Sequence, residues 1–494
     1  MAITTHINLA NLDGSNGFRL DGVEGDLSGR SVSNAGDVNG DGFDDVIVGA
    51  AGADPNGNSS GSSYVVFGKA SGFDATMELS SLDGSNGFRL DGVAAYDYSG
   101  SPVSNAGDVN GDGFDDLIVG AWSADPNDVD SGSSYVMFGK ASGFSAKMDL
   151  FSLDGDNGFR LDGVAAYDYS GSSVSNAGDV NGDGFDDLIV GAWSADPNDV
   201  DSGSSYVVFG KASGFSAKMD LSSLDGSNGF RLDGVLWSER SGISVSSAGD
   251  MNGDGFDDVI VGASFANFYG FRNGSSYVVF GKASGFDAKM NLFSLDGSDG
   301  FRLDGGGPGD YSGSSVSSAG DVNGDGFDDL IVGASRASPN GNESGSSYVV
   351  FGKASGFSAT MELSSLDGDN GFRLDGVAAY DYSGRSVSNA GDVNGDGFDD
   401  LIVGAGDADS NGELSGSSYV IFGRSDFGHD VDFPGTAGDD ELIGTKAAEL
   451  FEAGDGNDKM IGRGGADTFY GEAGDDYIRV ADLNFQLVDG GAGR

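Results

Sequence analysis

The sequence is poor in several residue types that commonly carry chemistry or stabilise small folds. It contains no cysteine, seven prolines and two histidines in 494 residues. Without cysteine the chain can form neither disulfides nor thiolate metal sites. The histidines, His6 and His429, lie near the edges of the repeated region, and we expect both to be solvated and not catalytic. No segment has about 18 continuous apolar residues, so no membrane-spanning helix is expected. The first 14 residues lack the basic and apolar regions of a signal peptide.

Basic side chains are also scarce. The chain has 25 lysines and arginines against 79 aspartates and glutamates, a formal net charge of −54. Such a surface repels phosphates, so neither nucleic acid nor membrane insertion is expected. The 89 glycines and 38% hydrophobic content indicate a folded chain with many tight turns. The charge either makes the surface very soluble or is neutralised by bound cations, and the spacing of the acidic residues decides between these interpretations.

One unit of 71 residues occurs six times. Its marker is the stretch DVNGDGFDD at 37–45, which returns at 108, 179, 250 (with Met for Val), 321 and 392. Each unit holds four short runs typical of β-strands, such as GFRLDG, SPVSNAG, DDLIVGAW and SSYVMFGK in the second copy. No window has a period of 3.6 residues, so helices should be nearly absent. Four strands repeated radially predict an all-β fold, a six-bladed β-propeller, with a seven-bladed ring or an open solenoid as alternatives.

The ends of the repeated region suggest how the ring closes. The chain enters at 7–22, which matches the outer part of a unit, and the last unit ends after 417–424 without its own FRLDG strand. We therefore expect residues 18–20 to supply the fourth strand of the sixth blade, which leaves no free sheet edge. The predicted domains are the propeller at 1–425, a linker at 426–434 and a second repeat region at 435–494.

The nine-residue loop has the pattern D-x-N-x-D-G-x-x-D. Its alternating oxygen ligands and its glycine at position 6 match the first half of an EF-hand loop. An EF-hand has a glutamate at position 12, where this chain has Val48, and a strand follows instead of a helix, which excludes both EF-hands and dockerins. Oxygen ligands without histidine or cysteine favour calcium, with magnesium second. The alternative is an acidic Asx-turn that binds no metal.

These motifs resemble a known family. The segment SGRSVSNAGDVNGDGFDDVIVGA at 28–50, followed by GSSYVVFG at 61–68, resembles the FG-GAP repeat of integrin α subunits and related bacterial surface proteins, over about residues 1–424. The resemblance implies calcium ligands at loop positions 1, 3, 5, 7 (carbonyl) and 9, about six ions in all. These are Asp37, Asn39, Asp41, Phe43, Asp45, Asp108, Asn110, Asp112, Phe114, Asp116, Asp179, Asn181, Asp183, Phe185, Asp187, Asp250, Asn252, Asp254, Phe256, Asp258, Asp321, Asn323, Asp325, Phe327, Asp329, Asp392, Asn394, Asp396, Phe398 and Asp400. The family usually has seven units of about sixty residues, which is why seven blades stay open as an alternative.

A different repeat begins at Gly435. The chain can be divided every nine residues into segments such as AGDGNDKMI and GEAGDDYIR, which approximate the G-G-x-G-x-D-x-U-x pattern of a parallel β-roll that binds calcium between its turns. The candidate ligands at the sixth position are Asp440, Asp458, Asp467 and Asp476. This region resembles the RTX repeats of proteins exported by bacterial type I systems, and the resemblance implies a few further calcium ions. The final DGGAGR is similar to the start of another turn, so we expect the chain to be a fragment of a longer protein.

The sequence shows no catalytic constellation, and we expect the protein not to be an enzyme. The one G-x-S-x-G, GNSSG at 57–61, lies in a polar loop without the strand–turn–helix context that a nucleophile needs. Carboxylate pairs such as Asp44 and Asp45 could form acid–base dyads, but every copy lies inside the predicted metal loop.

The expected function is an extracellular calcium-binding module, secreted or attached to the cell surface, that binds a protein or glycan. The fourth unit differs most from the others and supplies a candidate aromatic ligand patch. Its members are Trp237, Phe265, Phe268, Tyr269 and Phe271, with Trp122 and Trp193 as further candidates. Ordinary sequence drift in a loop is the alternative explanation of this difference. The alternative function is a passive scaffold in a larger exported protein whose active domain lies outside this chain.

Overall fold

The computed structural model describes residues 14, 17–70, 72–268, 271–283, 285–409, 415–424, 433–444, 450–463, 468–471, 473–480 and 487–490. The chain divides into two compact units, of which the first comprises residues 1–366 and 372–425 and the second residues 426–494 together with 367–371. Each unit is a fold of its own. Among the residues described, no helix is long and apolar enough to cross a membrane.

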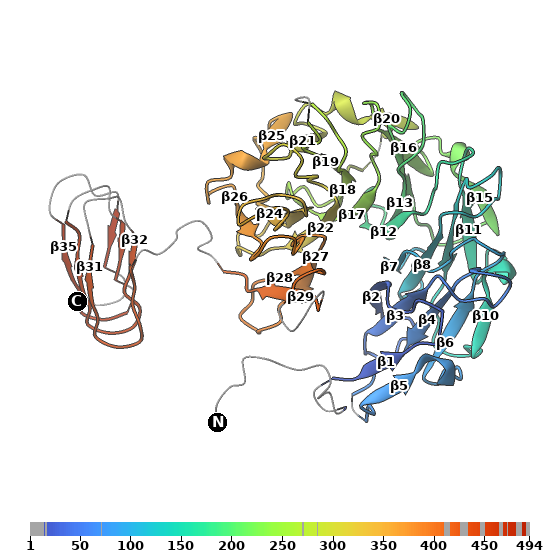
Figure 1. Cartoon of the computed structure of the whole chain (residues 1–494), viewed down its shortest axis with the longest axis horizontal. Helices are drawn as coiled ribbons and strands as arrows, with labels where there is room; N and C mark the ends of the chain where they lie inside the picture. The colour runs from blue at the N-terminus through green and yellow to red at the C-terminus, as the bar shows by residue number, and fades with distance from the viewer. Residues whose placement is uncertain are drawn as a thin grey trace. The chain divides into compact units, whose positions relative to one another are not determined.

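Most of the first unit consists of six blades, each a sheet whose first three strands are antiparallel, and Figure 1 shows the blades around a common centre with the first strand of each innermost. In order from the first strand outward, blade 1 is β2 (Ser31–Gly36), β3 (Asp45–Ala50), β4 (Ser62–Val66), β6 (Gly87–Asp91) and β10 (Lys147–Asp149). Blade 2 is β7 (Val103–Gly107), β8 (Asp116–Ala121), β9 (Ser133–Met137), β11 (Gly158–Asp162) and β15 (Lys218–Asp220). Blade 3 is β12 (Ser173–Gly178), β13 (Asp187–Ala192), β14 (Ser204–Val208), β16 (Gly229–Asp233) and β20 (Lys289–Asn291). Blade 4 is β17 (Ser244–Gly249), β18 (Asp258–Ala263), β19 (Ser275–Val279), β21 (Gly300–Asp304) and β25 (Thr360–Glu362). Blade 5 is β22 (Ser315–Gly320), β23 (Asp329–Ala334), β24 (Ser346–Val350) and β26 (Gly371–Asp375), and blade 6 is β27 (Ser386–Gly391), β28 (Asp400–Ala405) and β29 (Ser417–Ile421).

The core lies between neighbouring blades. The second strands are nearly continuous apolar runs, such as DLIVGA in β13, where every residue is buried. Strands have such sequences when both faces of their sheet are covered. Here Ile118 and Val136 of blade 2 lie in one cluster with Leu188 and Val190 of blade 3. The predicted six-bladed all-β propeller is therefore confirmed.

Four blades carry a fifth strand that the sequence did not predict. The three-residue strand β10 pairs in parallel with β6, with Met148 beside Leu90. The chain thus leaves blade 2 after β9, adds β10 to the outside of blade 1, and returns to blade 2 as β11. A 3-10 turn follows each of these four strands: η3 (Leu150–Ser152), η4 (Leu221–Ser223), η5 (Leu292–Ser294) and η6 (Leu363–Ser365). One more, η2 (Leu79–Ser81), lies earlier in the chain. These turns are the only helices in the part of the chain that is described, as the lack of a helical period predicted.

The predicted closure of the ring by the N-terminal strand is wrong for this structure. The strand β1 (Arg19–Asp21) pairs in parallel with β5 (Thr76–Glu78), and β29 is an edge strand of a three-stranded sheet. The reason is that β1 and β5 repeat the local pairing of β6 with β10. The two end blades consequently keep one uncovered face each. Val32 of blade 1 is 65% exposed and Val420 of blade 6 is 47% exposed, whereas the equivalent Val174 and Val207 are buried.

The second unit contains two small parallel sheets, consistent with the predicted β-roll. One sheet consists of β30 (Phe433–Pro434), β32 (Leu450–Glu452), β34 (Thr468–Tyr470) and β36 (Leu487–Asp489), and the other of β31 (Glu441–Ile443), β33 (Lys459–Ile461) and β35 (Tyr477–Arg479). Paired residues in β31, β33 and β35 are 18 positions apart in the sequence. One coil of the roll therefore consists of two nonapeptides. The rings of Phe451 and Phe469 stack at 4.7 Å between centroids and form the core with Met460.

Candidate metal sites

The acidic loop joins the first and second strands of each blade. In blade 1 it runs from Asp37 to Asp45, after a β-bulge at the end of β2. The side-chain Oδ1 of Asn34 accepts a hydrogen bond from the Gly36 N–H at 2.7 Å and holds this bulge. Gly36 and Gly42 have φ of +67° and +87°, in the left-handed region that glycine adopts without strain. The positions of the glycines therefore determine the path of the loop.

The aspartates at loop positions 1 and 5 brace the turn from inside. Oδ1 and Oδ2 of Asp37 accept hydrogen bonds from the N–H groups of Asp41 and Gly42 at 2.9 and 2.8 Å. Oδ1 of Asp41 accepts one from the Phe43 N–H at 3.0 Å. The same three bonds recur in the other five loops. The loops therefore share one conformation.

The aspartate at position 9 begins the second strand and is buried. Asp45, Asp116, Asp187, Asp258, Asp329 and Asp400 are each at most 1% exposed. In every blade Oδ1 accepts a hydrogen bond from a glycine N–H after the third strand, which is Gly68 at 2.7 Å in blade 1. In blades 2 to 6 Oδ2 accepts a hydrogen bond from the N–H of the position 2 residue, which is Val109 at 3.1 Å in blade 2. Oδ2 of Asp45 is buried and has no such bond among the described residues. A buried carboxylate without a balancing positive charge is unfavourable.

The pKa values of these buried aspartates reflect that imbalance. Burial, with the negative charges of Asp41 and Asp37 acting in the same direction, raises the pKa of Asp45 to about 7. The pKa values of the four equivalents in blades 2 to 5, Asp116, Asp187, Asp258 and Asp329, rise to about 8 for the same two reasons. A cation bound in the loop would favour the charged form instead.

The predicted ligands lie within one turn, but their carboxylates do not converge on one point. Across the described ranges, no three aspartate, glutamate or histidine side chains are close enough to hold a metal ion. The carboxylates of positions 1 and 5 accept hydrogen bonds from backbone N–H groups instead. Asn39 and the Phe43 carbonyl are assigned as calcium ligands from their positions in the loop pattern. The donor set nevertheless fits calcium, because it contains only oxygen and includes the unpartnered Oδ2 of Asp45.

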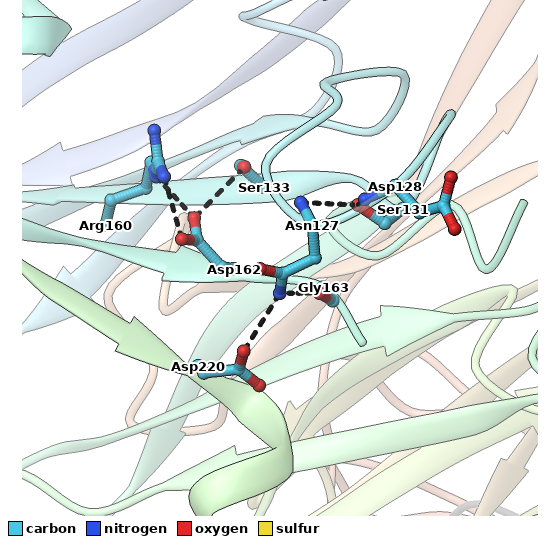
Figure 2. Close-up of polar contacts among 8 residues, drawn as sticks. All are labelled: Asn127, Asp128, Ser131, Ser133, Arg160, Asp162, Gly163 and Asp220. Atoms are coloured by element: carbon cyan, nitrogen blue, oxygen red, sulfur yellow. Dashed lines mark hydrogen bonds and ion pairs between the residues drawn. The ribbon is translucent and has the colours of Figure 1, made fainter. Parts of the chain in front are cut away.

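Other repeated carboxylates have protein partners. In blade 2 the guanidinium of Arg160 forms a two-pronged ion pair with Asp162, and Ser133 donates a hydrogen bond to the same carboxylate (Figure 2). The Asn127 side-chain amide donates to the Gly163 carbonyl at 2.7 Å and to Asp220 at 2.9 Å. The positive charge that balances Asp162 is therefore on Arg160, two residues away on the same strand. The aspartates at loop position 9 have no such partner among the described residues.

In the second unit, the predicted aspartates link successive coils. The Asp440 N–H donates to Oδ1 of Asp458 at 2.8 Å, and the Asp458 N–H donates to Oδ1 of Asp476 at 2.9 Å. Oδ2 of Asp458 and of Asp476 is buried without a partner in the described part of the unit, which again fits an oxygen-seeking cation. The fourth predicted ligand, Asp467, lies outside the described residues.

The structure divides the predicted aromatic patch. Trp237 and Phe271 are 67% and 60% exposed. Phe265 lies between the guanidinium groups of Arg240 and Arg272, at 4.3 and 4.9 Å from its ring centroid, and the Arg302 guanidinium covers Phe268 at 3.8 Å. Tyr269 lies outside the described residues. Trp122 and Trp193 are half-buried and stack on Tyr98 and Tyr169 respectively. Of the four patch members that the structure describes, Trp237 and Phe271 are therefore the two that are freely exposed.

Comparison with known proteins finds both repeat types. Residues 28–66, 103–137, 170–208, 241–279, 312–350 and 383–421 match the FG-GAP repeat, and each match spans the first three strands of a blade and its acidic loop. Residues 443–478 match the RTX calcium-binding nonapeptide repeat, in four copies. Both resemblances predicted from the sequence are confirmed.

The similar proteins include integrins and one enzyme. The chain is 34% identical to integrin alpha-PS5 of Drosophila melanogaster over 163 residues, which are 32% of this chain and 14% of the relative. It is 32% identical to integrin alpha pat-2 of Caenorhabditis elegans over 253 residues, 48% of this chain and 18% of the relative. It is 27% identical to phosphatidylinositol-glycan-specific phospholipase D of Dictyostelium discoideum over 352 residues, 65% of this chain and 33% of the relative. The chain therefore spans a third or less of the length of these relatives.

Proposed function

Since this chain is an FG-GAP repeat β-propeller protein with C-terminal RTX calcium-binding repeats, we propose that it is a non-enzymatic calcium-binding module that acts outside the cell. The propeller loops hold calcium through positions 1, 3, 5 and 9 and the carbonyl of position 7. The observation that carries the proposal is the buried aspartate at position 9, of which Asp45 keeps one oxygen without a partner. Bound calcium would supply the positive charge that this carboxylate lacks.

The residues of the loop have separate roles in this proposal. The glycines set the turn, and positions 1 and 5 hold oxygens within it. Position 9 begins the second strand and anchors the loop to the chain just after the third strand, through its bond to Gly68 in blade 1. Because the loop starts and ends on adjacent strands, an occupied loop would tie those strands together.

Calcium binding should therefore stabilise the fold. Extracellular modules bind calcium with dissociation constants of about 10⁻⁴ to 10⁻³ M. At tenfold saturation one site adds about 1.4 kcal/mol to the free energy of unfolding. Six such sites would add about 8 kcal/mol, which is comparable with the whole stability of an ordinary domain. We propose that the chain is loosely folded at cytoplasmic calcium levels and rigid outside the cell, after export by the type I route with which RTX repeats are associated.

The proposed role outside the cell is adhesion, that is, binding of a protein or glycan partner. It is supported by the sequence similarity to integrin α subunits and by the exposed Trp237 and Phe271. The second candidate is a passive scaffold for a domain elsewhere in a longer protein. It is supported by the arginine contacts of Phe265 and Phe268, which are two of the five members of the predicted patch.

Two measurements test the proposal. Thermal unfolding followed by circular dichroism, with calcium and with a chelator, should give a higher midpoint in calcium, and superimposable curves would refute the calcium role. Protein and glycan arrays probed in both conditions separate the two candidate roles. Retention that requires calcium and is lost in a Trp237→Ala, Phe271→Ala double variant supports adhesion, whereas no retention on any array supports the scaffold.

A further inference from the structure

We propose that the aspartate at loop position 8 in each of blades 2 to 6 is a positioning residue for the calcium loop of the preceding blade. This residue, Asp328 in blade 5, was not among the predicted ligands. The inference rests on the proposed calcium function and adds to it the group that holds each loop in shape. It follows from contacts between consecutive loops that recur along the propeller.

The first contact is a pair of hydrogen bonds between the loops of blades 4 and 5. Oδ2 of Asp328 accepts a hydrogen bond from the Asp250 N–H at 2.8 Å, and the Asp328 N–H donates to the Asp250 carbonyl at 3.4 Å. Asp250 is the position 1 residue of the fourth loop, so both of its backbone polar groups are held by the next blade. The carboxylate bond recurs between Asp115 and Asp37, Asp186 and Asp108, Asp257 and Asp179, and Asp399 and Asp321, at 2.7, 2.8, 2.8 and 3.1 Å.

The second contact is packing against loop position 4. The ring of Phe327 lies against Gly253, where a Cβ atom would stand 2.4 Å from the ring carbon Cε1. The Lys353 N–H donates to the Met251 carbonyl at 2.8 Å. Positions 1, 2 and 4 of the fourth loop are therefore all touched by blade 5. The same packing recurs in four other loops. A Cβ atom would stand 2.2 to 2.4 Å from the phenyl ring of the following blade at Gly40, Gly111, Gly182 and Gly324.

The sixth loop shows what happens without a following blade. Its position 2 residue, Val393, is 59% exposed, whereas the equivalent Met251 is fully buried. A Cβ atom at Gly395, the position 4 residue, would meet nothing within 4 Å. Among the residues that the structure describes, no side chain accepts a hydrogen bond from the backbone N–H of Asp392, whereas the equivalent Asp250 N–H is bound by Asp328. The sixth loop thus has the same ligand pattern as the other five and lacks their support.

The physical consequence concerns preorganisation. An ion binds more tightly to a loop that is already held in its bound shape, because less ordering of the chain accompanies binding. The carboxylate of Asp328 binds the Asp250 N–H of the fourth loop. It therefore supports the fourth loop and is not a calcium ligand in the fifth loop, to which Asp328 belongs. We therefore expect the first five loops to bind calcium at a lower concentration than the sixth. Loss of one position 8 carboxylate should lower the calcium affinity of the preceding loop about tenfold.

Hydrogen exchange measured by mass spectrometry on the full chain tests this at single loops. The fourth loop is unique in mass because of Met251, and the flanking residues distinguish the fifth and sixth loops. For each loop, amide protection is followed as calcium is added. In Asp328→Ala the midpoint of the fourth loop should rise about tenfold while that of the fifth loop changes little. In Asp399→Ala the shift should move to the fifth loop, so the two variants control each other.

Several outcomes decide the matter. A shift of the fifth loop in place of the fourth in Asp328→Ala would mean that position 8 acts in its own loop, and the proposal would be wrong. A sixth loop that fills together with the others would contradict it as well. If Asp328→Ala does not fold, Asp328→Asn keeps one acceptor oxygen and should give a smaller shift in the fourth loop. If no loop of the unaltered chain gains protection with calcium, the proposed calcium function itself fails.

Discussion

The substitution Asp45→Asn should have opposite effects on stability with and without calcium. Asp45 is 1% exposed, and its Oδ1 accepts the Gly68 N–H, while its Oδ2 has no partner in the described structure. An asparagine keeps the acceptor oxygen on Gly68 and removes the charge. Without metal the variant should therefore be more stable than the unaltered protein at neutral pH. With calcium it should be less stable, because the loop has lost a charged ligand.

The size of the metal-free effect follows from the pKa of the folded state. The pKa of Asp45 is about 7 when folded, against an ordinary value of 3.8. A raised carboxyl pKa means that the folded state holds a proton that the unfolded state releases, so stability is lost as pH rises from about 4 to 7. At 1.36 kcal/mol per pH unit, the loss at pH 7 is about 4 kcal/mol for this one group. The substitution should recover much of it at pH 7 and none of it below pH 4.

Thermal unfolding at several pH values, in chelator and in calcium, measures this directly. The expected result is a crossing: Asp45→Asn melts above the unaltered protein at neutral pH in chelator and below it in calcium. The exposed neighbour Asp44 provides the control, since Asp44→Asn removes the same charge and should move neither curve appreciably. A variant that melts lower in chelator at every pH would refute the reasoning, because the carboxylate would then stabilise the fold through its bond to Gly68.

Three further substitutions test other parts of the structure. Arg231→Met leaves the buried Asp233 without its ion-pair partner, so the free energy of unfolding should fall by about 3–5 kcal/mol. Denaturant unfolding should show the same decrease in calcium and in chelator. Gly182→Ala places a Cβ 2.2 Å from a ring of the next blade, whereas Gly184→Ala has a similar positive φ and meets nothing, so calorimetry should show a larger loss of melting temperature in the first. Asp458→Asn should lower the calcium-bound melting transition of the second unit and leave that of the propeller unchanged, which calorimetry of the full chain can separate.

The features predicted from sequence are those encoded by neighbouring residues. The run at 187–192 has the apolar content of a strand covered on both faces, and it is one. The glycine at loop position 6 indicates a left-handed turn, and Gly42 has φ of +87°. The confirmed repeat families rest on the same short patterns. Such features can be predicted from a single sequence because each is determined by residues within a short segment.

The features that were missed depend on residues far apart. The bond between Asp328 and Asp250 joins positions 78 residues apart, and nothing in the loop pattern separates position 8 from an ordinary exposed acid. The strand β10 has three residues, too few for an alternating pattern. Arg240 and Arg302, which contact Phe265 and Phe268, lie on other segments, so those two side chains appeared to be as available as Trp237.

The return of the chain to the preceding blade affects how the propeller would respond to mechanical load. Since β10 is added to the edge of β6 before β11 completes blade 2, each sequence unit spans two adjacent sheets. A pulling force on the ends must separate β6 from β10 before blade 1 can open, and that separation also frees a segment between two strands of blade 2. Stretching should therefore extend the chain in steps longer than one 71-residue unit.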